Sequence, residues 1–451
     1  MLMSVLEKAA EMLEKHALCD HCLGRQFALL GLEMENDERG KAIKQVLTLN
    51  AQALAFQGDK AAVKLLKVLA TNGFFDMAEK ILHKMKKRIP SSSITKTCYL
   101  CENKFENVDK LANDALRQLE KYEYSSFLVG VELPINVEEK EDEFKAELEI
   151  GHGENLRNEF GRSIGKKIAL ANKKAVEFKK PEIVVLVNPF TEKVRLQVNP
   201  LYISGYYKKL VRGIPQSKWF CSNCRGKGCE KCNWTGKMYP ESVEELITKP
   251  IIEASEGTKG SFHASGREDI DARMLGKGRP FVIEITCPRK RSLDLKKLEK
   301  VVNIYGQGKI EVSNLRFADR DAVRRLKRGE AAQKEYRVLV EFEKEINAKQ
   351  LNQLKKQLSN TIIRQQTPTR VLHRRADLTR EKYIYDVKVK KLSAKTIEMK
   401  VRCQGGLYVK ELVSGDEGRT KPSVSEILQN QAKPLKLDVL NVFMKGKEMK
   451  D

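Results

Sequence analysis

Gly266-Arg267-Glu268-Asp269, continued by Ile270-Asp271-Ala272, is the most informative stretch of this sequence. It precedes the apolar run Phe281-Val282-Ile283-Glu284-Ile285, which is typical of a buried strand. Because glycine permits a tight turn, the stretch predicts a loop that presents the carboxylate of Asp269 near a core strand. A catalytic aspartate would occupy such a position. The simpler interpretation is a glycine turn in which Asp269 caps a helix and Arg267 is solvated.

Two later segments add to this loop. Lys334-Glu335-Tyr336 opens a predicted strand, and Gly405-Gly406-Leu407-Tyr408-Val409-Lys410 follows further along the chain. In their order, the three segments resemble the Gly-Arg-x-Asp, Lys-x-Tyr and Gly-Thr-Tyr-Ile-Arg/Lys motifs of pseudouridine synthases. Together with the basic stretch from Arg364 to Arg375, they resemble in particular the archaeal-type tRNA synthase that acts on the TΨC loop, at positions 54 and 55 in tRNA numbering.

The resemblance implies an isomerase that converts uridine in tRNA to pseudouridine and needs no metal or organic cofactor for catalysis. It makes Asp269 the nucleophile and Lys410 the basic residue that pairs with it. Tyr336 would pack against the target base, and Tyr408 would be a second substrate contact. Leu407 departs from the threonine that is usual in the family, which affects local hydrogen bonding rather than the lysine.

Three arginines lie close to Asp269 in the sequence. Arg267, Arg273 and Arg279 could fill the space that a flipped uridine vacates, or they could contact phosphates. Arg267 belongs to the motif itself, and we expect it to contact the substrate. A solvated or structural role remains the alternative for each of the three.

The composition favours a polyanionic partner such as nucleic acid, and the resemblance implies that this partner is tRNA. Among 451 residues, Lys and Arg number 84 and Asp and Glu number 61, which gives a formal charge of +23. No uninterrupted apolar run approaches the roughly 18 residues that a membrane-spanning helix needs. The segment from Met1 to His16 also lacks the apolar centre of a signal peptide. We therefore expect a cytoplasmic protein with no membrane partner.

Four closely spaced cysteines predict a metal site. They form two Cys-x-x-Cys pairs, Cys221 with Cys224 and Cys229 with Cys232. Two such pairs can complete a closed, tetrahedral Zn²⁺ site. A redox dithiol is the alternative, but it needs only one pair. The segment is therefore expected to hold a structural zinc ion.

A second set of four cysteines is divided along the chain. A long insert separates Cys19 and Cys22 from Cys98 and Cys101, so spacing alone does not show that the two pairs meet. Such pairs are poor disulfide candidates in a reducing compartment. We expect the four cysteines to share a second structural zinc ion.

The pattern of apolar residues divides the chain into three parts. Residues 1–97 are predicted to be helical, to carry the first cysteine pair and to close at Pro90-Ser91-Ser92-Ser93. Residues 98–245 would form an RNA-binding region that ends with the second cysteine cluster, and residues 246–451 the catalytic domain. Strand-to-strand turns in the last part predict an α+β domain with a mixed or antiparallel sheet. Pseudouridine synthases have this fold class.

The RNA-binding region shows its own order of elements. A strand at Phe127–Val131 is followed by a basic helix from about Phe160 to Lys179 and by a hairpin through Asn188-Pro189-Phe190-Thr191. This order resembles the THUMP RNA-binding module of tRNA-modifying enzymes, so an α/β RNA-binding domain is expected before the catalytic domain. Aromatic residues alternate with cations from Leu201 to Arg212, which suits either base stacking or core packing.

Two other functions remain open. The first is a non-catalytic, zinc-containing tRNA-binding or chaperone protein in which Asp269 is an ordinary turn residue. The second is a tRNA modifier with other chemistry, such as a methyltransferase, which would need a cofactor fingerprint. The glycine-rich segments Gly276-Lys277-Gly278 and Tyr305-Gly306-Gln307-Gly308 lack the strand, turn and helix that such a fingerprint requires. No small-molecule cofactor is therefore expected.

Overall fold

The computed structural model describes residues 4–31, 33–89, 97–328 and 333–443. It divides into two compact units, residues 1–199 and 200–451, and each is described by itself. The predicted end of the helical part at Pro90–Ser93 lies outside the described residues. Among the helices of the described ranges, none combines the length and the apolar character needed to span a bilayer.

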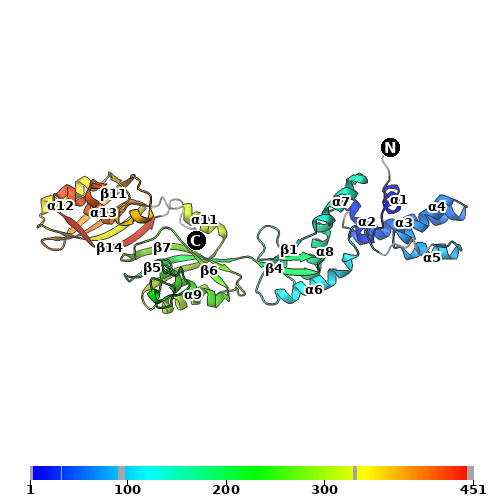
Figure 1. Ribbon diagram of the computed structural model, residues 1–451, viewed down its shortest axis with the longest axis horizontal. Coiled ribbons are helices and arrows are strands. Elements are labelled where there is room, and N and C mark those ends of the chain that lie inside the picture. Colours follow the sequence, from blue (N-terminus) through cyan, green and yellow to red (C-terminus); the bar gives the residue numbers. More distant parts are fainter. Residues whose placement is uncertain (1–3, 32, 90–96, 329–332, 444–451) are drawn as a thin grey trace. The chain divides into compact units, whose positions relative to one another are not determined.

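The first unit consists of helices followed by a small α/β domain (Figure 1). Its helices are α1 (Val5–Lys15), α2 (Asp20–Gly24), α3 (Asn36–Phe56), α4 (Lys60–Thr71), α5 (Asp76–Lys84), α6 (Val108–Leu119), α7 (Ile135–Glu147) and α8 (Leu156–Asn172). Its strands are β1 (Ser126–Val131), β2 (Ala175–Val176), β3 (Ile183–Asn188) and β4 (Lys193–Val198). The sheet has the order β2-β1-β3-β4, with β1 parallel to both neighbours and β3 antiparallel to β4. The predicted strand and hairpin are therefore confirmed.

Helix α8 is the basic helix of the prediction, but it ends earlier than Lys179. Lys173 adopts a left-handed conformation with φ 55°, which ends the helix. The chain then enters β2, which pairs with β1. Phe160, Ile164 and Ile168 are buried, and α8 packs against β1 through this face. α6 packs against α8 and β4, so both helices cover the same small sheet (Figure 1).

The second unit is built on one ten-stranded sheet. Its strands are β5 (Leu201–Lys209), β6 (Lys259–Ala264), β7 (Arg273–Thr286), β8 (Ile310–Ala318), β9 (Gln333–Phe342), β10 (Thr361–Gln365), β11 (Arg380–Lys391), β12 (Thr396–Gln404), β13 (Thr420–Lys421) and β14 (Ala432–Phe443). The order is β13-β10-β11-β12-β9-β14-β7-β5-β8, and β6 pairs with β7. In the described residues β7 and β14 pair in parallel and the other neighbours pair antiparallel. The predicted α+β fold with a mixed sheet is confirmed.

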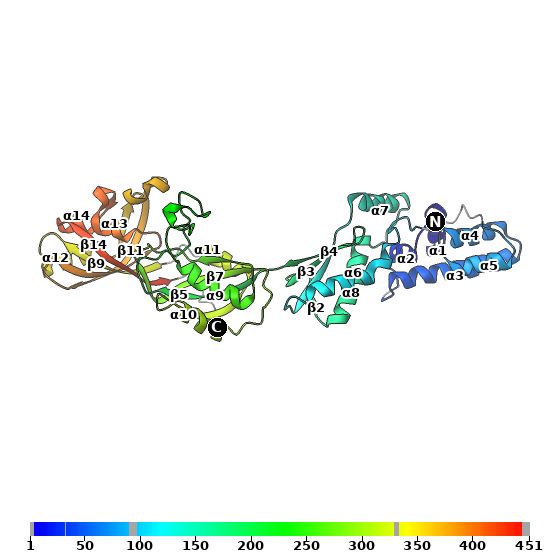
Figure 2. The same cartoon turned by 60° about the horizontal axis from the view of Figure 1, so that its bottom comes forward.

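Two large hydrophobic cores and one small cluster, formed by Val282 of β7 and residues of α11 (Arg320–Arg328), lie along this sheet. The other helices are α9 (Val243–Ser255), α10 (Leu295–Tyr305), α12 (Ala348–Leu358), α13 (Val409–Ser414) and α14 (Val424–Leu428). α9 and α10 contact the half that contains β6 and β8, and α12 and α13 contact the half that contains β11 and β14 (Figure 2). Tyr336, on β9, packs against both cores. The centre of the sheet therefore lies where the two halves of the unit join.

The segment from residue 200 to 245 lies in the second unit rather than with the RNA-binding region. β5 hydrogen-bonds to β7 on one side and to β8 on the other, which makes it an interior strand of the large sheet. The second cysteine cluster follows in the same unit. The compact division consequently falls between residues 199 and 200, whereas the sequence analysis placed a boundary between 245 and 246.

Candidate active site and cysteine clusters

The loop between β6 and β7 carries Asp269. Gly266 begins this loop with φ +74°, and a Cβ atom there would lie 3.2 Å from Nζ of Lys334 and 3.4 Å from a terminal nitrogen of Arg279. Glycine therefore permits both the left-handed turn and the close approach of two cations. The loop leads directly into β7, so Asp269 does not cap a helix.

A buried network supports the loop from β5 and β7. Glu268 accepts hydrogen bonds from the hydroxyl of Tyr207, at 3.0 Å, and from Nε of Arg279, at 3.0 Å. All three side chains are buried. Gln216 donates to the Tyr207 hydroxyl at 2.6 Å and to the carbonyl of Gly266 at 2.9 Å. A buried charge needs such partners, and these partners tie the loop to the sheet.

Lys209 lies on β5 directly behind the aspartate. Its buried ammonium donates to the carbonyl oxygens of Ile214 at 2.9 Å, Asp269 at 3.0 Å and Ile270 at 3.2 Å. Burial lowers the pKa of Lys209 to about 8. The sequence analysis gave Lys209 no role. The sequence did contain one signal for a buried position. Lys209 lies two residues after Tyr207, and residues two apart share one face of a strand, which in β5 is the face that packs in the core.

The carboxylate of Asp269 is 38% exposed and lies between two cations. Nζ of Lys410 is 3.4 Å from Oδ2 of Asp269, and a terminal nitrogen of Arg370 is 3.3 Å from the same atom. Lys410 also contacts both oxygens of Asp271, at 2.8 and 2.7 Å. Burial is the largest single influence and acts to raise the pKa of Asp271, but the hydrogen bonds and charge of Lys410, the backbone and the charge of Arg370 together hold that pKa below its usual value. Two carboxylates therefore share Lys410.

Arg370 is a second cation at the site, and the sequence analysis did not single it out. Its Nε donates at 2.7 Å to Glu411, a buried carboxylate on α13, while its terminal nitrogen faces Asp269. The sequence from residue 364 to 375 contains several arginines, and no local pattern distinguishes this one. Its role depends on the packing of the loop between β10 and β11 against α13.

A cavity of about 680 Å³ opens beside Asp269. This volume is within the usual range for small-molecule sites, roughly 300 to 1,000 Å³. Lys410, Tyr336, Tyr408 and Arg267 also line the cavity, so the fold brings all five residues named from the motifs to one place.

The two tyrosines have different surroundings. Burial raises the pKa of Tyr336, so its hydroxyl is protonated at neutral pH. The hydroxyl of Tyr408 accepts a hydrogen bond from Arg375 at 2.8 Å. Leu407, which replaces the usual threonine, is buried and lines the cavity.

The three arginines near Asp269 differ in their partners. The guanidinium of Arg267 lies 5.7 Å from the ring centroid of Trp219, at the cavity wall. Arg279 pairs with Glu268. Arg273 donates two hydrogen bonds to Asp438, at 2.9 and 3.0 Å. Arg273 and Arg279 thus have the structural contacts that the sequence analysis left open as an alternative.

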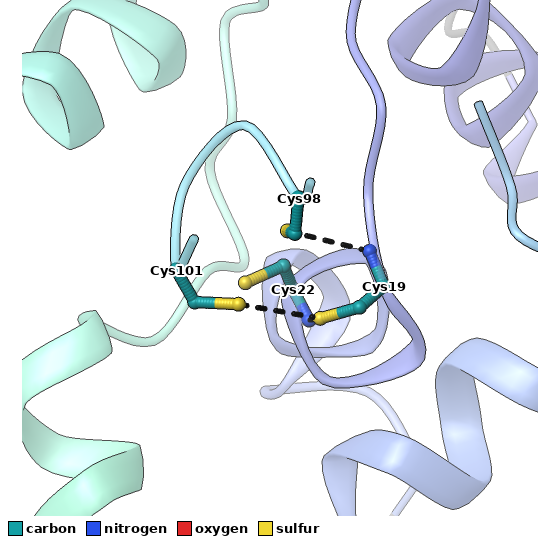
Figure 3. Close-up of side chains that lie close together, drawn as sticks. All are labelled: Cys19, Cys22, Cys98 and Cys101. Carbon is teal, nitrogen blue, oxygen red and sulfur yellow. Dashed lines mark hydrogen bonds between the residues drawn. The ribbon is translucent and has the colours of Figure 1, made fainter. Parts of the chain in front are cut away.

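The four N-terminal cysteines lie side by side. Cys19 and Cys22 lie at the start of α2, Cys98 and Cys101 lie on a turn before α6, and their side chains point toward one another (Figure 3). The four sulfur atoms lie within 4.8 Å of one another, and those of Cys19 and Cys101 are 3.6 Å apart. A tetrahedral zinc ion with Zn–S bonds of about 2.3 Å separates its sulfurs by about 3.8 Å. The geometry fits zinc.

The second cluster has the same geometry. The sulfur atoms of Cys221, Cys224, Cys229 and Cys232 lie within 4.8 Å of one another. Three of the pairs are 3.7, 3.8 and 3.9 Å apart, close to the tetrahedral value. Both groups could therefore hold structural zinc.

Comparisons with known proteins agree with the motifs. Residues 202–443 match a family model described as Pus10, C-terminal, and residues 111–188 match one described as Pus10 THUMP domain, archaeal. A tRNA pseudouridine synthase Pus10 of Methanocaldococcus jannaschii is 44% identical, over 96% of this chain and 93% of that protein. One of Methanothrix thermoacetophila is 40% identical, over 97% and 94%. These matches show that the chain is a pseudouridine synthase, an isomerase.

The chain belongs to the Pus10 family of tRNA pseudouridine synthases. Solved structures are more distant. A Cbf5-Nop10-Gar1 complex is 13% identical with a TM-score of 0.30, covering 53% of this chain and 50% of that chain. A pseudouridylate synthase is 11% identical with a TM-score of 0.22, covering 55% and 66%.

Proposed function

We propose that this chain converts uridine to pseudouridine in the TΨC loop of tRNA, at positions 54 and 55, with Asp269 as the nucleophile. The observation that carries the proposal is the carboxylate of Asp269 at the wall of a cavity, between Lys410 and Arg370. The name of the relatives supports tRNA as the substrate, and the formal charge of +23 suits a polyanion.

The isomerisation breaks the bond between C1′ of the ribose and N1 of uracil and forms a bond between C1′ and C5. The proton on C5 is released, a proton returns to N1, and there is no net oxidation. The carboxylate of Asp269 attacks either the ribose or the base. Lys410 and Arg370 contact this carboxylate and hold it at the cavity wall.

The cavity walls have the task of holding the uracil while it turns. Tyr336 stacks on the base, and its protonated hydroxyl can donate a hydrogen bond or move a proton. Tyr408 is a second contact, and Arg267, which lines the cavity, contacts the flipped nucleotide. Unstacking the uridine requires a few kcal/mol, which contacts along the tRNA must offset.

The two cysteine groups would hold zinc as a structural element and take no part in these steps. The expected place of this activity is the cytoplasm.

Tritium release tests the proposal. Pure protein is incubated with tRNA that contains 5-³H-uridine, and the modified positions are then mapped by mass spectrometry. Release of tritium together with pseudouridine at positions 54 and 55 is expected. A tRNA-binding or chaperone protein would bind the tRNA and release no tritium, and pseudouridine confined to other positions would contradict the proposed substrate.

A further inference from the structure

The second cysteine cluster lies in a knuckle, residues 217–239, which takes no part in the proposed reaction. The knuckle begins next to the site, because Trp219 faces Arg267 at the cavity wall. Its outer surface carries two exposed aromatic side chains, Trp234 at 72% and Phe220 at 57%. Large exposed aromatic rings on one short segment are typical of surfaces that contact a partner.

The two halves of the knuckle repeat each other. The first half is Cys221-Ser-Asn-Cys224-Arg-Gly-Lys-Gly228, and the second half, which follows directly, is Cys229-Glu-Lys-Cys232-Asn-Trp-Thr-Gly236. When the two halves are aligned on their cysteines, Trp234 occupies the position of Gly226. Both residues are left-handed, with φ +99° at Gly226 and +60° at Trp234. Glycine adopts this conformation freely, whereas a bulky side chain is strained there.

The fold of the knuckle therefore does not call for a tryptophan at position 234. The backbone favours glycine, and the indole is mostly in water rather than in a core. A side chain that is both strained and exposed destabilises the free protein. Binding to a partner is the physical reason that remains for it.

Charge indicates which partner. Residues 217–239 contain five lysines and arginines and one acidic residue, Glu230. Lys218, Arg225, Lys227 and Lys231 are exposed, and within the described residues none of these four forms an ion pair with a carboxylate. Nζ of Lys218 lies 5.0 Å from the ring centroid of Phe220. Exposed aromatic rings beside cations that have no carboxylate partner are typical of surfaces that bind unpaired RNA, because bases stack on the rings and phosphates contact the cations.

We propose that the knuckle is an RNA-contact surface on which the indole of Trp234 stacks on an unpaired base of the substrate tRNA. This inference rests on the proposed function, because the RNA is the tRNA whose uridine enters the cavity. The contact between Trp219 and Arg267 places the knuckle beside the cavity wall, so one RNA can reach both. The cations favour RNA over an apolar protein segment.

Substitutions at position 234 test the stacking. Trp234→Gly removes the ring and relieves the strain, so the variant should fold at least as well as the wild type. We expect its KM for tRNA to rise about fivefold or more, since base stacking of this kind is worth that much, with kcat nearly unchanged. Trp234→Phe keeps a ring and should restore most of the affinity.

A matched control is available on α10. Ile304 is 77% exposed in the same unit, and Ile304→Ala should leave KM and kcat unchanged. If Trp234→Gly has the KM of the wild type, the proposal is overturned, and the exposed ring faces a protein instead.

Fluorescence gives a second readout that needs no catalysis. The chain has two tryptophans, so Trp219→Phe leaves Trp234 as its single indole. Stacking predicts that tRNA quenches this emission and that a fully paired RNA duplex does not. Equal quenching by both, or by neither, would contradict stacking. The position of pseudouridine made by the wild type tests the proposed function, whereas these comparisons between variant and wild type test the knuckle.

Discussion

The carboxylate of Asp269 shares both of its cations with other acids. Lys410 contacts Asp271 and Arg370 contacts Glu411, each at a shorter distance than to Asp269. Asp269 is thus surrounded by positive charge but is not locked into one close ion pair. A nucleophile in such a position is held near the substrate and is still free to move toward it.

The first prediction concerns Asp269→Asn. An amide has nearly the same shape but cannot act as a nucleophile, so tRNA binding should persist while pseudouridine formation falls to background. Tritium release measures the reaction, and fluorescence anisotropy with whole tRNA measures binding. More than a trace of turnover would remove Asp269 from its proposed role.

The second prediction concerns Lys410→Met. Loss of one cation removes a contact that positions the carboxylate of Asp269, so kcat should fall roughly tenfold or more while tRNA binding persists. Arg370 remains within 3.3 Å of Asp269, and we therefore expect a further loss of kcat in Lys410→Met combined with Arg370→Met.

Asp271→Asn is the matched control for this prediction. It removes the carboxylate that competes for Lys410, so kcat should not fall as it does in Lys410→Met. Full activity in Lys410→Met would show that the lysine is not part of the site.

The catalytic loop depends on β5 for its position. Lys209 donates to three carbonyl oxygens, two of which belong to Asp269 and Ile270. A charged ammonium has three N–H donors and a neutral amine has two. Deprotonation of Lys209 would leave one of the three carbonyls without its partner.

The third prediction is a loss of kcat on the alkaline side. Because burial lowers the pKa of Lys209 to about 8, the side chain is charged below that pH and neutral above it. We expect kcat to fall as the pH rises through about 8, with little change in KM. Three carboxylates of the loop, Glu268, Asp269 and Asp271, favour the charged form of Lys209. Arg279, on β7, opposes it.

Lys209→Met tests the same contact without a titratable group. Its kcat should be roughly ten- to a hundredfold lower, as expected for a displaced catalytic group, and should lack the alkaline limb. Unchanged tRNA affinity would show that the variant is folded. An alkaline limb that persists in the variant would have to come from another group.

The fourth prediction concerns the cysteine clusters. Protein purified without chelator should contain about two zinc ions per chain, and each cluster should lose its own ion when two of its cysteines are replaced. Cys98→Ser with Cys101→Ser should lower the melting temperature, since these buried residues join the turn before α6 to α2. Cys229→Ser with Cys232→Ser should affect a local segment only. Fewer than two zinc ions in the wild type would show that one cluster is empty.

In the whole molecule, the formal charge of +23 suits a polyanionic partner such as RNA. On and just after α8, Lys166 pairs with Glu35 and Lys167 with Asp109, while Lys173 and Lys174 lie beyond the helix end. These ion pairs are largely exposed, so a phosphate can replace the carboxylate at little expense in free energy.

The fifth prediction replaces these four lysines by glutamine. The salt dependence of tRNA binding should become flatter, by up to about one unit of log–log slope for each lost phosphate contact, and KM should rise with kcat nearly intact. Lys41→Gln with Lys64→Gln, on exposed positions of α3 and α4, is the comparison. An unaltered slope would mean that the tRNA is bound elsewhere, with the knuckle as the first alternative.

Local sequence patterns were sufficient for several conclusions. The spacing of Cys221 to Cys232 predicted a closed cluster, and the Gly266–Asp269 turn predicted a loop before a buried strand. The mixed sheet followed from strand-to-strand turns. Each of these features depends on residues that are close in sequence, so their chemistry and spacing can be read directly.

The tertiary structure alone decided how distant residues meet. Pairing of β7 with β14, and of β14 with β9, brings the loop of Asp269 close to Tyr336, while α13 and the segment before β11 add Lys410 and Arg370. Contacts between elements far apart along the chain determine which arginine reaches Asp269. Such contacts also place Lys209 where it supports the loop from inside. Local sequence propensity does not encode such contacts, because they form only when distant strands and helices pack together in the folded unit.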